Sequence, residues 1–151
     1  MTARKLGDEF ARHLHVSILK KLGFRKSRHW FWRERTGYVE LFEIQGSSWN
    51  SGEGPWRFYV NVYVRFADIG PLSGVVSANP YHANGRIERI VSSAPAKFEV
   101  SSINLAQVAR DLGGIIVLAS EALPNLLPAA REYATRGLLS PLPVPAGWVK
   151  S

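Results

Sequence analysis

A strict alternation of apolar and polar residues from Trp56 to Phe66 is the clearest structural signal in the chain. Side chains of a β-strand point alternately to opposite faces, so only a strand separates the two sets. We therefore predict a central strand of a sheet, with its apolar set in the core. The apolar set is Trp56, Phe58, Val60, Val62, Val64 and Phe66, and the polar set is Arg57, Tyr59, Asn61, Tyr63 and Arg65.

Near the N-terminus, apolar residues recur every four positions, at Leu6, Phe10, Leu14, Ile18 and Leu22. This spacing predicts an amphipathic helix over about residues 4–22. Gly23 suits the left-handed conformation that closes a helix, and Phe24 is placed for the hydrophobic contact that accompanies such a cap.

Four further segments predict strands. Residues 30–34 and 38–45 are rich in strand-forming residues and flank the turn signal Thr36-Gly37, so we predict a hairpin. Residues 86–92 and 97–101 predict two short strands. Residues 47–55 and 68–85 are rich in Gly, Pro, Ser and Asn, and we predict irregular connections there, the first carrying Trp49.

The C-terminal part predicts helices that pack on the sheet. One helix carries Leu105, Val108, Leu112, Ile115, Ile116 and Ala119 on one face, with Asn104 and Gln107 as a capping box. Gly113 and Gly114 weaken it, Pro124 and Pro128 break or kink its continuation, and a last helical stretch ends near Arg136.

The fold class that follows is α+β, with an N-terminal amphipathic helix, an antiparallel sheet of about five strands and C-terminal helices on one face. We predict a single domain over residues 1–137 and a proline-rich tail over residues 138–151, whose extended stretch ends at Trp148.

Composition excludes several kinds of chemistry. The chain has no cysteine, so disulfides, thiolate nucleophiles and thiolate metal sites are excluded. The charged N-terminus lacks a signal-peptide pattern, and the densest apolar run, residues 115–119, is far shorter than the ~20 residues that span a bilayer. We therefore expect a cytoplasmic protein without membrane contact.

The net charge of +7 is concentrated at one end of the chain. Residues 1–35 hold ten Lys and Arg against three acidic residues, an excess that equals the net charge of the whole chain. A solvated helix face explains this distribution, and a site for a polyanion is the alternative.

Residues with catalytic or metal-binding chemistry do not form a recognisable pattern. His13 and His15 lie two residues apart on a helix and face opposite ways, so we predict no metal site and no cofactor. The available catalytic groups show no diagnostic spacing, and the prediction leans against an enzyme. These groups are His29, Glu40, Glu43, Asp68, His82 and Glu88.

The polar face of the central strand is the best candidate binding surface. Its tyrosines offer stacking surfaces, and its arginines offer charge-assisted hydrogen bonds, so it suits a planar or anionic ligand. An ordinary solvated sheet face is the alternative interpretation. The residues in question are Arg57, Tyr59, Asn61, Tyr63 and Arg65.

Several short segments together resemble the bacterial DUF4304 family over most of the chain up to about residue 122. These segments are residues 19–26, 31–33, 44–45, 49–52, 57–62 and 86–90. The resemblance is carried by Gln45, Trp49, Phe58, Asn61, Arg86 and Arg89. It implies a helix, antiparallel strands and C-terminal helices, and no established activity or cofactor.

The resemblance also implies a location for a site, and it adds Gln45, Trp49, Arg86 and Arg89 to the five candidate ligand-binding residues of the central strand. Gln45 and Asn61 are amides on strands, and an amide that faces away from the core suits hydrogen bonds to a ligand or partner backbone. Which face Gln45 takes stays open, because Val39, Leu41, Phe42 and Ile44 are apolar on both sides of their strand.

Three classes of function follow. The leading hypothesis is a non-enzymatic binding module that holds a protein partner or small ligand on its exposed sheet face and Trp49 loop. The second is nucleic-acid binding through the basic N-terminal third, which would weaken steeply with salt. The third is an enzyme with an unrecognised site. The oligomeric state is not predicted.

Overall fold

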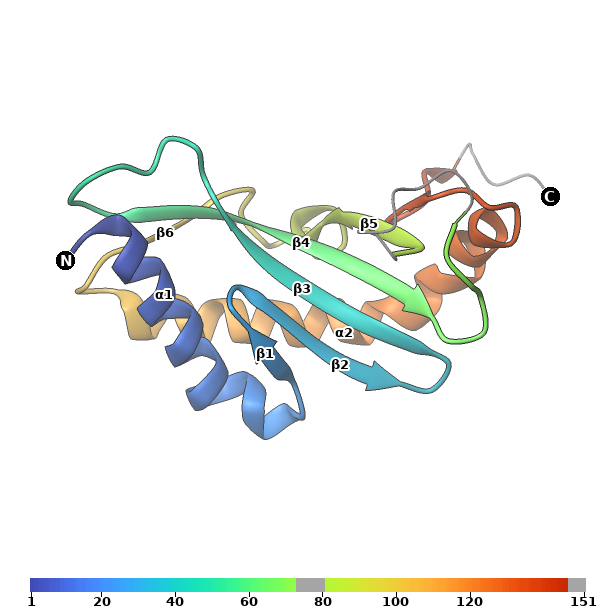
Figure 1. Ribbon diagram of the computed structural model, residues 1–151, viewed down its shortest axis with the longest axis horizontal. Coiled ribbons are helices and arrows are strands. Elements are labelled where there is room, and N and C mark those ends of the chain that lie inside the picture. The colour runs from blue at the N-terminus through green and yellow to red at the C-terminus, as the bar shows by residue number, and fades with distance from the viewer. Residues whose placement is uncertain (73–80, 147–151) are drawn as a thin grey trace.

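Two layers make up the fold, a mixed sheet and a pair of helices that cover one of its faces (Figure 1). The computed structural model describes residues 1–72 and 81–146. The helices are α1 (Ala3–Leu14), η1 (His15–Leu19), η2 (Lys20–Leu22), η3 (Ile87–Arg89) and α2 (Leu105–Thr135). The strands are β1 (Arg25–Ser27), β2 (Trp30–Arg35), β3 (Tyr38–Gly46), β4 (Trp56–Phe66), β5 (Ala83–Arg86), β6 (Phe98–Val100) and β7 (Ser140–Pro141).

The sheet follows the order β1-β2-β3-β4-β5-β7, and β6 also pairs with β4. All pairs are antiparallel except β5 with β7. The α+β class, the hairpin at Gly37 and the central strand β4 are confirmed. The described residues form seven strands rather than about five. The two additional strands, β1 and β7, have three and two residues and are too short to show an alternating pattern.

Two details of the predicted strands are wrong. Asn84-Gly85 was expected in the irregular connection, yet it lies inside β5. Residues 86–92, expected as a strand, contain the short helix η3 instead. Ile87 and Val91 are buried four residues apart, which fits one helical turn, and the amide of Val91 donates to the carbonyl of Ile87 at 2.8 Å.

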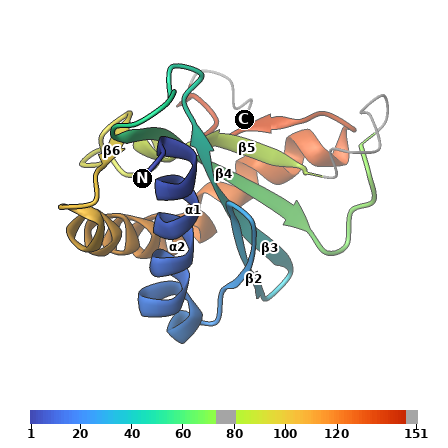
Figure 2. The same cartoon turned by 60° about the vertical axis from the view of Figure 1, so that its left-hand side comes forward.

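The face of the sheet that packs on α1 and α2 is called the inner face, and the opposite one the outer face. All six apolar side chains of β4 are at most 4% exposed on the inner face. In Figure 1 the orange ribbon of α2 runs behind β1 and β2, and Figure 2 shows the same arrangement from another side. The core therefore lies between the helices and the inner face.

The N-terminal helix changes its winding before it ends. It is α-helical only to Leu14, and a π-helical turn and a short 3₁₀ segment complete it before Gly23. The wider turn shifts the apolar face by about one position, so Leu19 is fully buried whereas Leu22 is exposed. The left-handed Gly23, with φ of 92°, and the buried Phe24 confirm the predicted cap.

A single helix, α2, replaces the several C-terminal helices of the prediction. It continues through Pro124 and Pro128 to Thr135. Gly113 is required for packing, because a Cβ there would lie 2.8 Å from a methyl carbon of Ile18. The capping box is wrong as well, since the Oδ1 of Asn104 accepts from the amide of Ser101 rather than from the helix.

The helix α2 is long and apolar. Its length and apolar content alone would allow it to cross a membrane, a test that core helices of soluble proteins also pass. Here its buried residues Leu112, Ile116 and Leu123 belong to the core beneath the sheet. The helix therefore packs as a core element of the domain.

A buried ion pair and the hydrogen bonds of its arginine link four elements on the inner face. Glu40 of β3 is fully buried, and its Oε2 accepts from the Nε of Arg33 at 3.0 Å and lies 3.3 Å from the Nε of Arg35. Arg33 also donates to the Leu22 carbonyl and the Ser120 hydroxyl, both at 2.8 Å. Its guanidinium thus joins β2 and β3 to η2 and α2.

The start of the predicted tail is attached to the sheet. β7 pairs with β5, and the amide of Leu142 donates to the carbonyl of Asn84 at 2.8 Å. Leu142 is 1% exposed. Gly85 allows this approach, since a Cβ there would lie 2.0 Å from the Leu142 carbonyl oxygen. The predicted end of the tail, Trp148, lies outside the described residues.

Candidate functional site

The outer face gathers seven of the nine residues predicted to bind a ligand. Residues paired directly across neighbouring strands point to the same face. Because Gln45 pairs with Tyr59 and Arg86 pairs with Asn61, both join the polar face of β4. The register therefore settles the orientation of Gln45. The seven are Gln45, Arg57, Tyr59, Asn61, Tyr63, Arg65 and Arg86.

The two other predicted residues lie elsewhere. Trp49 is 79% exposed on the loop between β3 and β4, where its amide donates to the Ser47 hydroxyl. Arg89 is exposed on η3. The structure therefore does not bring Trp49 and Arg89 into the outer face defined by the strands.

The carboxylate of Glu43 is the centre of a hydrogen-bond network on the outer face. Its Oε1 accepts from the Nδ2 of Asn61 at 2.9 Å and from the hydroxyl of Tyr63 at 3.0 Å. The same Asn61 nitrogen donates to the Oε1 of Gln45 at 2.8 Å. The amide protons of Asn61 are thus used within the face, and the network holds three neighbouring side chains in fixed positions.

Aromatic side chains on the outer face pack against one another. The rings of Trp30 and Tyr81 are stacked with centroids 5.6 Å apart, and Tyr63 lies 4.9 Å from Trp30 and 4.6 Å from Tyr81. These contacts fix the three rings, so little rotamer freedom is left to lose when a partner binds.

Tyr59 is engaged by two cations. The guanidinium of Arg86 lies 4.2 Å and the ammonium of Lys97 5.3 Å from the centre of its ring. Such cation–π contacts are attractive because the ring face carries negative potential. The expected free stacking surface of Tyr59 is therefore partly used by the protein itself.

Burial raises the pKa of the Tyr63 hydroxyl far above its ordinary value near 10, and the nearby Glu43 charge and hydrogen bond add to the effect. Burial, followed by the Glu43 charge, also raises the pKa of Tyr81. Both tyrosines are therefore neutral at physiological pH, and Tyr63 acts as a hydrogen-bond donor to a carboxylate.

The raised pKa of Tyr63 makes a prediction for alkaline stability. Above about pH 10 an unfolded tyrosine ionises while Tyr63 in the folded protein keeps its proton, so stability falls as pH rises. We expect the free energy of unfolding, measured in urea from pH 8 to 11, to decline more steeply for the wild type than for Tyr63→Phe. The difference between the two slopes against pH should correspond to at most one proton released per molecule on unfolding. If the free energies of unfolding of the two proteins fell in parallel with pH, Tyr63 would not keep its proton in the folded state.

Three members of the Glu43 network and the aromatic cluster on this face, namely Trp30, Glu43 and Tyr81, were not among the predicted binding residues. The turn at Gly37 fixes the register of β2 on β3, so the pairing of Trp30 with Glu43 follows from the hairpin alone. Tyr81 follows a long connection without any periodic pattern. No sequence signal places it beside Trp30.

The candidate catalytic residues are dispersed. Glu40 is paired on the inner face and Glu43 is on the outer one, while Asp68 binds Arg131. The buried His82 accepts from the amide of Phe66 through Nδ1 and bonds the Gly70 carbonyl through Nε2, so both ring nitrogens are used to fix the chain around it. Within residues 1–72 and 81–146, no group of three His, Asp or Glu could hold a metal ion.

Comparison with known families matches the chain to one domain model, described as a domain of unknown function (DUF4304), over residues 15–112. Neither the curated proteins nor the solved structures contain a match. The matched range includes β1 to β6 and thus the strands that carry the outer face. Since the match covers well over half of the sequence, this chain belongs to the DUF4304 family.

Proposed function

We propose that this domain is a non-enzymatic binding module whose outer sheet face holds a protein partner with an acidic surface. The observation that carries the proposal is the composition of that face. Tryptophan, tyrosine and arginine are the residue types that dominate the binding energy of protein interfaces. All three are concentrated here, held in place by the Glu43 network and by the aromatic cluster of Trp30, Tyr63 and Tyr81.

Charge favours an acidic partner. By strand register and by contact with Tyr59, the face carries more basic than acidic side chains. The basic ones are Arg25, Arg57, Arg65, Arg86 and Lys97, and the acidic ones are Glu34, Glu43 and Glu99. Glu43 is surrounded by donors, and Glu99 is 3.5 Å from Arg57. The positive excess would steer an acidic surface towards this face.

Apolar area is available beside these charges. Trp32 and Leu41 are paired across β2 and β3, and both are half-buried on the outer face. A partner that covers them would remove apolar surface from water, which is the main favourable contribution to protein association. A small ligand that fits between these side chains is the alternative occupant.

The proposal is tested by capture with matched charge reversals. Arg65→Glu changes an exposed residue of the outer face, and Arg110→Glu changes an exposed residue of α2 by the same charge. We expect the immobilised wild type and Arg110→Glu to retain the same acidic protein from a cell lysate, and Arg65→Glu to lose it. With that protein purified, Arg65→Glu should weaken the affinity at least tenfold, measured by calorimetry.

Thermal melting of both variants controls for folding, since exposed charges contribute little to stability. Equal capture by Arg65→Glu and the wild type would contradict the proposal. A saturable small metabolite that co-purifies with the wild type and is lost in Arg65→Glu would assign the face to the small-ligand alternative.

A further inference from the structure

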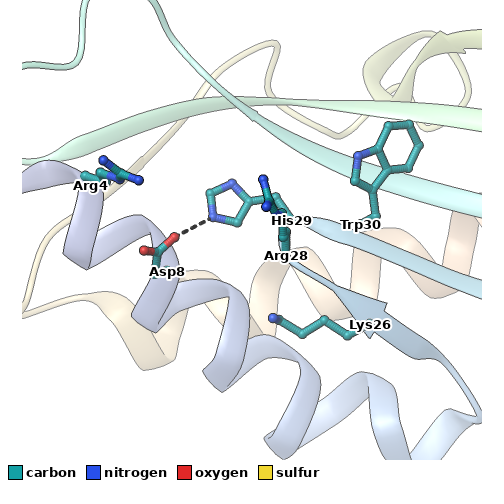
Figure 3. A pocket seen from close by; sticks show the side chains of 6 residues that line it. All are labelled: Arg4, Asp8, Lys26, Arg28, His29 and Trp30. Atoms are coloured by element: carbon teal, nitrogen blue, oxygen red, sulfur yellow. Dashed lines mark hydrogen bonds and ion pairs between the residues drawn. The ribbon is translucent and has the colours of Figure 1, made fainter. Parts of the chain in front are cut away.

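A second candidate site lies between α1 and the hairpin of β1 and β2, and among its lining residues it shares Trp30 with the outer face. It is a pocket of about 710 Å³. Figure 3 shows Arg4 and Asp8 on α1, opposite residues of the hairpin. The lining residues are Arg4, Asp8, Lys26, Arg28, His29 and Trp30. This volume is in the range of pockets that hold small organic ligands.

The spacing of residues on α1 and the tight turn of the hairpin place these side chains around one space. Arg4 and Asp8 are four residues apart on α1 and therefore lie on the same side of the helix. Ser27 pairs with Trp30, so Arg28 and His29 form a two-residue loop that faces α1 (Figure 3). Lys26 extends from β1 towards the same space (Figure 3).

The pocket has an unbalanced positive charge. Its lining contains one carboxylate, that of Asp8, and this group lies 3.0 Å from the Nε2 of His29. Arg4, Lys26 and Arg28 form no ion pair or side-chain hydrogen bond with any residue in the described part of the chain. Three like charges around one cavity repel one another, and a bound anion would relieve that repulsion.

The hairpin turn fixes the backbone of Arg28. Its φ is 54°, in the left-handed region, and it is the one residue other than glycine with positive φ in the described ranges 1–72 and 81–146. A two-residue hairpin loop requires a positive φ at its first residue, which is Arg28 here. The turn therefore holds the start of the Arg28 side chain in one place beside the pocket.

From these observations we propose that the pocket binds the phosphate group of a phosphate ester. Two guanidinium groups and one ammonium group offer several donors, and guanidinium forks match the oxygens of a phosphate in pairs. Trp30 lies at the edge of the pocket, and its ring is turned away from Arg4 and Asp8, towards Tyr63 and Tyr81 of the outer face (Figure 3). The phosphate comes from a free ester or from the backbone of a nucleic acid.

The test compares a pocket variant with a charge-matched control. Arg28→Gly removes one positive charge from the pocket and suits the left-handed backbone, so the fold should be kept. Lys21→Ala removes one positive charge from η2, where Lys21 is exposed and does not line the pocket. The probes are adenosine monophosphate and a single-stranded oligothymidylate, titrated calorimetrically at low salt.

We expect at least one probe to bind the wild type and Lys21→Ala alike, and to bind Arg28→Gly at least tenfold more weakly. Arg4→Gln should give a loss of the same kind. Binding of adenosine monophosphate identifies a free phosphate ester as the ligand, whereas binding of the oligothymidylate alone, with a steep dependence on salt, identifies a nucleic-acid backbone.

Two results would overturn the inference. One is the absence of saturable binding of both probes to the wild type. The other is an equal loss in Lys21→Ala and Arg28→Gly, which would show that diffuse positive charge rather than the pocket attracts the anion. Neither result depends on the outer face, so this site and the proposed protein-binding role stand or fall separately.

Discussion

Arg33→Ala is expected to lower the free energy of unfolding by about 3–5 kcal/mol, the cost of breaking a buried ion pair. The Glu40 carboxylate is fully buried and would lose its 3.0 Å partner. The carbonyl of Leu22 and the hydroxyl of Ser120 would lose their donor as well. Urea denaturation followed by circular dichroism measures the effect.

The matched control is Arg35→Ala, which removes the same charge beside the same carboxylate. The Arg35 side chain is 40% exposed, compared with 18% for Arg33, and its Nε lies 3.3 Å from Glu40. We expect a loss of about 1 kcal/mol or less, because the Arg35 guanidinium is partly solvated and Glu40 keeps Arg33 as its partner. Similar losses in the two variants would mean that burial of Arg33 is not what makes the interaction strong.

Gly85→Ala should destabilise the domain by about 1–3 kcal/mol through overpacking. Its Cβ would meet a backbone oxygen, that of Leu142, at 2.0 Å. Neither β5 nor the residues after β7 can move away without losing the hydrogen bond from Leu142 to Asn84. Denaturation and amide hydrogen exchange of Ser140 and Leu142 measure the effect, and both amides should exchange faster.

Gly114→Ala serves as the control for adding a methyl group to a glycine. A Cβ there meets nothing within 4 Å, and alanine is favoured over glycine in helices. We expect a gain of about 0.5–1 kcal/mol. Unchanged exchange at Ser140 and Leu142 in Gly85→Ala would contradict the close contact between β5 and the tail.

Patterns within single segments predicted much of this fold. The alternation of residues 56–66 reproduces the bounds of β4, and Gly37 marks the turn between β2 and β3. Both signals are local, because each depends only on side-chain period or backbone conformation. The amphipathic helix was predicted for the same reason, whereas its change to a wider turn at His15, where Ile18 lies against Gly113 of α2, was not.

Features that depend on distant partners were not predictable. β1 and β7 have three and two residues, too few for any period, and only their neighbours β2 and β5 make them strands. The same holds for the pocket, whose Arg4 and Arg28 are adjacent only because α1 packs beside the hairpin. Sequence located the excess charge in residues 1–35 but not the place where it converges.

The two ends of the sheet limit how a partner can approach. β1 offers three residues of free backbone, and two of them are Arg25 and Lys26. β7 offers two residues, one of which is Pro141, which has no amide proton to donate. β6, which lies off this path and pairs with β4, is also three residues long, so none of these edges provides a long template for an added strand. We therefore expect a partner of the outer face to be recognised mainly through side chains, so that single substitutions rather than backbone pairing determine which partners are accepted.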